Sequence, residues 1–303
     1  MLLGFAAAAL ATAACVAALA RRAERKNPPT GLMMSVGGET IHYVVKGRGP
    51  PCVLIHGSLV YHPDFIACGL VDLLALTHTV YAFDRPGYGY SSRASRRPCS
   101  PLEQAHLLRQ CMARLGISGA TVIGHSMGAV VGLALALQHP DCVRKLVLVG
   151  GYYYPSDHAL TLLRPITWPV VGRIWSYTVG ALSARLSFPR IVKSIFHPRQ
   201  TPAAFGLWVK KELMLRPKQL RSSAEDAGLM NQSVRTMSQR YHEIQVPVVF
   251  IAGKDDRIVD PEDHSIRLHG EIEHSELVIV PGQGHMVHYA VADAISRAVN
   301  EVM

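Results

Sequence analysis

Mostly apolar segments recur along the chain, at residues 52–55, 79–83, 121–123, 142–149, 246–252 and 276–280. Apolar runs that do not alternate with polar residues are typical of strands buried on both faces. Helical patterns separate some of them, an amphipathic one at 102–115 and one of small apolar residues at 127–137. This alternation of strand and helix predicts a mostly parallel, doubly wound α/β sheet with helices on both faces.

Two regions depart from the alternation. Residues 33–36 and 40–45, separated by Gly37 and Gly38, predict a β-hairpin at the start of the domain. From 156 to 243 the strand rhythm stops, and helical segments interrupted by prolines replace it. We therefore predict a core in two parts, residues 32–155 and 244–303, with a helical insertion at 156–243. The first half of the insertion is rich in large apolar residues, namely Leu160, Leu162, Leu163, Ile166, Trp168, Val170, Val171, Ile174, Trp175 and Val179.

The N-terminal segment predicts a membrane anchor. Residues 2–20 carry no charge, and a helix of this length would cover roughly the ~30 Å hydrocarbon core of a bilayer. Basic residues follow at 21, 22, 25 and 26, and the positive-inside rule assigns them to the cytoplasm. We therefore expect residues 1–26 to be a single-pass transmembrane helix with the remaining chain in the cytoplasm. The alternative is a signal peptide cleaved after the small-x-small site Ala18-Leu19-Ala20, followed by export.

Composition excludes other classes of protein. With 303 residues, 49% of them hydrophobic and 17% charged, the chain is too apolar to be disordered. The formal net charge of +9 comes without a nucleic-acid recognition motif. We therefore expect no nucleic-acid partner and attribute the excess charge to an anionic membrane surface. The six cysteines show no metal-ligand spacing and favour a reducing compartment, and the oligomeric state stays open.

A candidate nucleophile lies between the third apolar run and the small-residue helix. Here Gly124-His125-Ser126-Met127-Gly128 forms a G-x-S-x-G pentapeptide. A tight turn from strand to helix leaves little room for a Cβ on either side of the serine, which explains both glycines. Such a turn raises the Ser126 hydroxyl above the sheet edge and directs the first free amides of the helix, Met127 N–H among them, towards a bound group.

Two further loops follow apolar strands. His56-Gly57-Ser58 ends the first strand, and its glycine would let the backbone approach a ligand, with the Ser58 amide as a second oxyanion donor. Asp84 and Arg85 open a loop rich in proline and glycine after the second strand. For these two charged residues we expect an ion pair that fixes the loop, not a role in catalysis.

Together these motifs resemble the α/β hydrolase superfamily, in its esterase, lipase and carbon-carbon hydrolase branch. The resemblance rests on HGS at 56–58, DRPGYGYS at 84–91 and GHSMG at 124–128, and it covers nearly all of residues 32–303. It implies the α/β hydrolase fold, a cap over the site at the position of the insertion, and a Ser-Asp-His order of catalytic residues. A serine in the pentapeptide, in place of aspartate, argues against a haloalkane dehalogenase or an epoxide hydrolase.

The remaining members of a triad are predicted from the second part of the core. Asp256 follows the strand at 246–252 in the register G-x-x-D that this family uses, and its neighbour Asp255 is the alternative. His285 follows the last strand within a loop rich in glycine. His288 is expected within a terminal helix at 286–302. A carboxylate after the strand would orient the histidine, which would in turn activate Ser126.

We therefore predict a serine hydrolase that cleaves carboxylic esters with apolar acyl groups through an acyl-enzyme. Gly57, His125 and Tyr152 are the candidate substrate-binding residues, and neither a metal nor a cofactor is expected. The apolar insertion favours an ester or lipid-like small molecule as substrate. A carbon-carbon hydrolase of dienone acids is one alternative, with Arg173, Arg185 or Arg190 as groups that grip the acid. The other is a protein that keeps the triad and works by binding.

Overall fold

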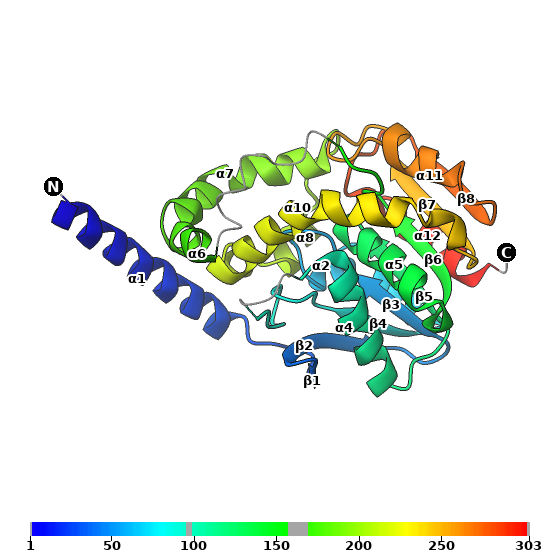
Figure 1. Cartoon of the computed structure of the whole chain (residues 1–303), viewed down its shortest axis with the longest axis horizontal. Helices are drawn as coiled ribbons and strands as arrows, with labels where there is room; N and C mark the ends of the chain where they lie inside the picture. Colours follow the sequence, from blue (N-terminus) through cyan, green and yellow to red (C-terminus); the bar gives the residue numbers. More distant parts are fainter. Residues whose placement is uncertain (1, 95–98, 157–168, 302–303) are drawn as a thin grey trace.

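The computed structural model describes residues 2–94, 99–156 and 169–301 (Figure 1). Within these residues eight strands form one sheet, in the spatial order β1 (Leu32–Val36), β2 (Glu39–Lys46), β4 (Thr79–Phe83), β3 (Pro51–Ile55), β5 (Ala120–His125), β6 (Val143–Val149), β7 (Val248–Gly253) and β8 (Ser275–Val280). The strands from β4 to β8 in this order run parallel, whereas β2 is antiparallel to β4 and β1 to β2. The mostly parallel sheet and its hairpin are as predicted.

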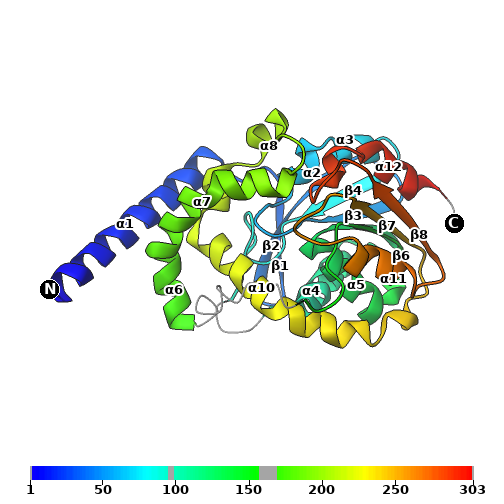
Figure 2. The ribbon, with the colours of Figure 1, turned by 90° about the horizontal axis from the view of Figure 1, so that it is seen from above.

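Helices cover both faces of the sheet (Figures 1 and 2). One face packs against α4 (Pro101–Arg114) and α5 (Met127–Gln138), and the other against α2 (Pro63–Ala67), α3 (Leu70–Leu74) and α12 (Ala292–Asn300). Shorter helical turns are η1 (Pro140–Cys142), η3 (Tyr241–Glu243), η4 (Glu262–Ile266), α11 (Arg267–His269) and η5 (Val287–Tyr289).

The alternation of side chains along the central strands creates two hydrophobic cores. In β5, Val122 belongs to the core that α4 and α5 close, and the next residue, Ile123, belongs to the core under α3 and α12. Neighbouring strands alternate in the same way, with Leu148 on the first side and Val147 on the second. Since all four side chains are fully buried, these strands read as continuous apolar runs.

The C-terminal helix is shorter than predicted. It begins at Ala292, not at residue 286, and ends at Asn300. Residues 287–289 form the separate 3-10 turn η5, in which the His288 imidazole is fully buried and bonded to a carboxylate. A buried polar side chain has to face its partner, and this contact holds the turn apart from the helix axis.

Helix α1 (Leu2–Lys26) corrects the prediction for the N-terminus. Among the described residues, no helix is both long and apolar enough to cross a membrane. The expected transmembrane anchor at 1–26, and with it the single-pass localisation with a cytoplasmic domain, is therefore wrong. The helix continues through the charged residues at 21–26, and there it packs on the domain: Ala23 is buried, and Glu24 forms an ion pair of 2.7 Å with Arg216.

Among the described residues between β6 and β7, where the insertion is predicted, five segments are α-helical and the turn η3 follows them. The helical segments are α6 (Pro169–Tyr177), α7 (Val179–Phe196), α8 (Ala203–Trp208), α9 (Lys211–Met214) and α10 (Pro217–Ser238). Of the apolar residues singled out there, Leu160, Leu162, Leu163, Ile166 and Trp168 lie outside the described residues, as do the side chains of Val170 and Val171. Ile174, Trp175 and Val179 are exposed.

Two glycines of α5 offer a matched test of how closely this helix crosses the sheet. A Cβ on Gly128 would lie 1.9 Å from the Ile55 carbonyl oxygen of β3, whereas one on Gly132 would lie 3.5 Å from Val122 Cγ1, an ordinary contact. We expect Gly128→Ala to lower the free energy of unfolding by about 3 kcal/mol or to prevent folding. Gly132→Ala should be neutral or stabilising by up to about 1 kcal/mol. Urea denaturation measures both, and equal stabilities would contradict the packing described.

Candidate active site

Ser126 lies in the sharp turn between β5 and α5. Its φ of 54° and ψ of −119° are unusual for a residue with a side chain, and such backbone strain often accompanies function. The neighbours explain how the turn closes, because a Cβ on Gly124 would lie 2.4 Å from the Gly128 carbonyl oxygen. The Ser126 amide donates a hydrogen bond of 2.9 Å to the Val149 carbonyl of β6. The local sequence thus fixes the turn on both sides of the serine.

The structure brings together the three residues predicted as a triad. The Ser126 hydroxyl lies 2.9 Å from His285 Nε2, and His285 Nδ1 lies 2.8 Å from Asp256 Oδ2. A carboxylate only accepts hydrogen bonds, so Nδ1 carries the proton and Nε2 is free to accept one from the serine. Ser126 comes from the end of β5, Asp256 from the loop after β7, and His285 from the loop after β8.

Asp256 and Asp255 have different surroundings. Besides His285, Asp256 accepts hydrogen bonds from the amides of Ile258 and Val259, at 2.8 and 3.0 Å, so its side chain is held in one position. Asp255 Oδ2 instead accepts from the Gly282 amide at 2.8 Å, on the outside of the loop. The structure therefore places Asp256, and not Asp255, against the histidine.

His125 supports the backbone of His285. The His125 Nε2 atom donates a 3.1 Å hydrogen bond to the His285 carbonyl oxygen. Burial, together with the neighbouring imidazoles of His288 and His285, holds the pKa of His125 well below its ordinary value, so the ring is neutral. His288 packs on it with ring centroids 4.2 Å apart and donates to Asp64 at 3.0 Å. His125 is thus buried beneath the site.

The turn that contains Gly57 packs directly against Ser126. A Cβ on Gly57 would lie 3.1 Å from Ser126 Cβ and 3.0 Å from His125 Nδ1, so a larger residue would require these neighbours to shift by a few tenths of an ångström. Ser58 follows in the chain, and Leu59 then adopts a positive φ of 68°. Met127, the first residue of α5, is buried. Ser58 and Met127 are the residues predicted to provide the oxyanion donors. They follow Gly57 and Ser126 in the chain, and these two residues lie against each other.

Tyr152 is held by the inserted segment. Its hydroxyl donates to Asn231 Oδ1 of α10 at 2.8 Å, and its ring packs on His264 with centroids 4.4 Å apart. These contacts explain how Tyr152 is oriented. They join the end of β6 to α10 and to η4, which is a structural connection, so Tyr152 stays a prediction as a substrate-binding residue.

Asp84 and Arg85 do not pair with each other, but each forms an ion pair with a partner outside the loop. Asp84 accepts hydrogen bonds from His42 Nδ1 at 2.8 Å and from His62 Nδ1 at 2.9 Å. Burial alone would raise the pKa of Asp84, but His62 and His42 hold it well below its ordinary value. Arg85 points the other way and pairs with Asp226 of α10 at 2.6 Å. The chain folds in this way because each buried charge then has its own partner.

Several buried polar contacts were not predicted from the sequence. Asp64, His288 and Asp226 are each less than 1% exposed and each bonded to a distant side chain. Asp226 lies inside a helical pattern with polar neighbours, and Asp64 follows a proline at the start of a short helix, so both resemble solvated positions. Neither position carries a signal in a single sequence.

Two groups of described residues could present ligand atoms to a metal ion, with those atoms within 4.8 Å of one another. They are His42, His62 and Asp84, and Asp64, His125 and His288. In the first group both imidazoles donate to Asp84, and His42 Nε2 accepts from the Gly31 amide at 3.2 Å. The atoms of this first group that would bind a metal ion are therefore already engaged in hydrogen bonds. In the second, His288 also donates to Asp64, while the Nδ1 atoms of both histidines have no partner among the described residues.

A parallel sheet that carries a nucleophile elbow after its fifth strand and a histidine after its last defines a class of hydrolase. A family model described as the alpha/beta hydrolase fold matches residues 50–290 of the chain. The chain belongs to this family, as the resemblance of its motifs predicts, and it is a hydrolase of the α/β class.

Individual relatives and solved structures share low sequence identity with this chain. An uncharacterised protein of Mycobacterium tuberculosis is 30% identical over 278 residues, which cover 85% of this chain and 76% of the relative. A 2-hydroxy-6-oxo-6-phenylhexa-2,4-dienoate hydrolase of Burkholderia cepacia is 25% identical over 85% of this chain and 88% of its own length. The solved enol-lactonase of Burkholderia xenovorans superposes with a TM-score of 0.72 at 20% identity, covering 89% of this chain and 98% of that one. The last likeness shows the fold.

The strained backbone of Ser126 predicts that a glycine at this position stabilises the fold. Ser126→Gly and Ser126→Ala both remove the hydroxyl, but only glycine tolerates the positive φ. We therefore expect the free energy of unfolding of the glycine variant to exceed that of the alanine variant by about 1 kcal/mol or more. Thermal and urea denaturation of the two variants measure the difference. An alanine variant as stable as the glycine variant would show that the turn is not strained.

Proposed function

We propose that the protein is a serine hydrolase that cleaves carboxylic esters with apolar acyl groups. One observation carries the proposal: a strained Ser126 whose hydroxyl lies 2.9 Å from His285 Nε2, while Asp256 holds the other ring nitrogen at 2.8 Å. This is the arrangement that lets a serine give up its proton at neutral pH.

In the first half of the reaction, Ser126 Oγ attacks the carbonyl carbon of the ester while His285 Nε2 takes the hydroxyl proton. Asp256 stabilises the imidazolium that forms and keeps its proton on Nδ1. The carbonyl oxygen becomes an oxyanion, and the amides of Ser58 and Met127 bind it, each worth roughly 3 kcal/mol. The carbon-oxygen bond then breaks, and His285 returns its proton to the leaving alcohol. The product of this half is an acyl group on Ser126.

In the second half, His285 accepts a proton from water as the water attacks the acyl carbon. A second oxyanion forms on the same donors and collapses to release the acid, while His285 returns the proton to Ser126. The family position of α6–α10, between β6 and β7, supports a role for this segment as a cap over the site. We propose that the cap selects apolar acyl groups.

Cleavage of a carbon-carbon bond in dienone acids is the second candidate function. It is favoured by the relative named as a dienoate hydrolase, and by another named 2-hydroxymuconate semialdehyde hydrolase, which is 25% identical over 93% of this chain. A substrate acid needs a cation, and Arg185 of α7 has a buried Nε without a hydrogen-bond partner among the described residues. Turnover of a 2-hydroxy-6-oxo-dienoate that exceeds turnover of every ester would favour this alternative.

A series of p-nitrophenyl esters from acetate to palmitate tests the proposal. We expect turnover by the wild type, with a chain-length optimum, and a loss of about 10⁴-fold or more in kcat in Ser126→Ala and in His285→Ala. Release of p-nitrophenol measures the rate, and thermal unfolding shows that each variant is folded. Undiminished hydrolysis by a folded Ser126→Ala would contradict the proposed nucleophile. Absence of turnover across the series would contradict the ester hydrolase and leave carbon-carbon cleavage or the binding role.

We further propose that a lipid surface is a partner of this hydrolase through helix α7. Val179, Leu182 and Leu186 follow one another at helical spacing and are 55%, 51% and 81% exposed. Arg190 and Lys193 continue the same face and are exposed. An apolar stripe that leads into basic residues fits the interface of an anionic bilayer, where a helix lies on the surface without crossing it.

Vesicle binding tests the apolar stripe. We expect the wild type to sediment with vesicles of phosphatidylglycerol and less with phosphatidylcholine, since the basic residues need an anionic surface. The double variant Leu182→Asp and Leu186→Asp should lose most of this binding. Leu76→Asp is the matched control, because Leu76 is 79% exposed in the turn after α3. Equal binding by the double variant and the control would exclude the stripe.

A further inference from the structure

Arg85 clamps the turn that leads to Ser58. Its guanidinium donates from Nε to the His56 carbonyl oxygen at 2.9 Å, and from Nη2 to the Gly57 carbonyl oxygen at 3.1 Å. Two consecutive peptide groups are therefore held by one planar guanidinium group. His56 adds a third contact, since its Nδ1 donates to the Gly57 oxygen at 2.7 Å, and its Nε2 accepts from the Arg85 amide at 2.9 Å.

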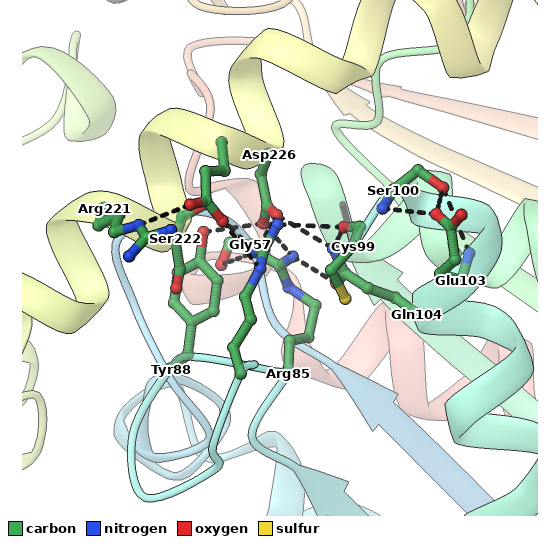
Figure 3. Close-up of polar contacts among 12 residues, drawn as sticks. Gly57, Arg85, Tyr88, Cys99, Ser100, Glu103, Gln104, Arg221, Ser222 and Asp226 are labelled. Carbon is green, nitrogen blue, oxygen red and sulfur yellow. Dashed lines mark hydrogen bonds and ion pairs between the residues drawn. The ribbon is translucent and has the colours of Figure 1, made fainter. Parts of the chain in front are cut away.

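The third nitrogen of the same guanidinium reaches the inserted segment. Arg85 Nη1 donates to Asp226 of α10 at 2.6 Å and to Gln104 of α4 at 2.9 Å (Figure 3). Asp226 also accepts from Tyr88 at 2.9 Å and from Arg93 at 2.6 Å. Arg85 is 2% exposed and Asp226 is fully buried, so a low local dielectric strengthens these contacts. Asp226, together with Gln104, thereby orients the Arg85 guanidinium from the side opposite the turn.

The geometry of a peptide group makes this clamp relevant to catalysis. The Gly57 carbonyl oxygen and the Ser58 N–H belong to the same trans peptide, so they lie in one plane and point in opposite directions. A side chain that fixes the oxygen therefore fixes the direction of the N–H. A cationic donor on the oxygen also polarises the peptide and makes the N–H a stronger donor.

We propose that Arg85, held by Asp226, is a positioning residue that aims and polarises the Ser58 amide towards the oxyanion. The proposal rests on the proposed hydrolase function and deepens it. It assigns to α10 a second role, because a carboxylate from the inserted segment sets the direction of a donor that the core provides. Burial alone would raise the pKa of Asp226, but Arg85 and Arg93 bring it below its ordinary value, which keeps the carboxylate charged.

The test removes the clamp without leaving an unpaired charge. Arg85→Gln combined with Asp226→Asn deletes both members of the ion pair, and Asp226→Asn alone is the second variant in case the double variant does not fold. Arg93→Gln is the matched control: Arg93 binds the same carboxylate at 2.6 Å, but its described contacts lie with Cys99, Ser222, Glu225 and Asp226, away from the turn. Each variant is assayed as the full chain, with thermal unfolding.

Three quantities are compared: kcat and KM for the best p-nitrophenyl ester, and the inhibition constant of an alkyl boronic acid, whose tetrahedral adduct with serine places an oxygen in the oxyanion site. We expect the double variant to lose about 10- to 100-fold in kcat, less than the 10²–10³ typical for deleting a donor, with KM nearly unchanged. The inhibition constant should rise in proportion. Asp226→Asn should show a smaller loss of the same kind, and Arg93→Gln should keep kcat within about twofold.

Other outcomes overturn the proposal. If the folded variants lose thermal stability but keep the wild-type kcat and boronic acid inhibition, the cluster only stabilises the fold, and the proposed function survives. If Arg93→Gln loses as much kcat as the double variant, the effect comes from general loosening of the loop. If the wild type neither hydrolyses an ester through Ser126 nor binds the boronic acid, the proposed function and the clamp fail together.

Discussion

A close approach between helix α5 and strand β3 fixes the relative position of two parts of the candidate site. At Gly128 the first turn of α5 crosses the end of β3 so tightly that a Cβ would lie 1.9 Å from the Ile55 oxygen. This crossing holds the elbow beside the residues that follow Ile55, and it therefore sets the distance between Ser126 and the turn at Gly57. Ser126 and the turn at Gly57 follow different strands, β5 and β3, which are neighbours in the sheet. One contact between backbones thus determines the relative position of two parts of the site.

Much of this arrangement can be predicted from the sequence because it depends on the backbone. Central strands buried on both faces must be apolar, and sharp turns that face a helix need glycine, so runs such as 121–123 and residues such as Gly124 carry the information locally. Ser126, Asp256 and His285 each follow a strand, and parallel strands deliver their ends to one edge of the sheet. Asp256 could be chosen over Asp255 by counting from Gly253 in the G-x-x-D pattern. A shift of one residue would change which aspartate side chain faces His285.

What could not be predicted depends on partners far away in the sequence. Asp84 and Arg85 are adjacent charges of opposite sign, yet one bonds to His42 and His62 and the other to Asp226. A buried charge is stabilised by whichever partner the packed fold delivers, and no spacing in the chain records that choice. The N-terminal helix shows the same limit. An uncharged run at 2–20 indicates a membrane span when considered alone, but its helix continues through the charged turns that pack on the domain.

The junction between α1 and the domain has a mechanical consequence. Glu24 pairs with Arg216, the Tyr90 hydroxyl bonds to the Asn27 carbonyl, and the Gly31 amide bonds to His42, so contacts follow the chain at intervals out of the helix. Both views show α1 projecting from the side of the body (Figures 1 and 2). These contacts join the helix to the domain rigidly, so the helix does not rotate about a flexible hinge. A force that turns α1 would therefore turn the whole hydrolase domain with it.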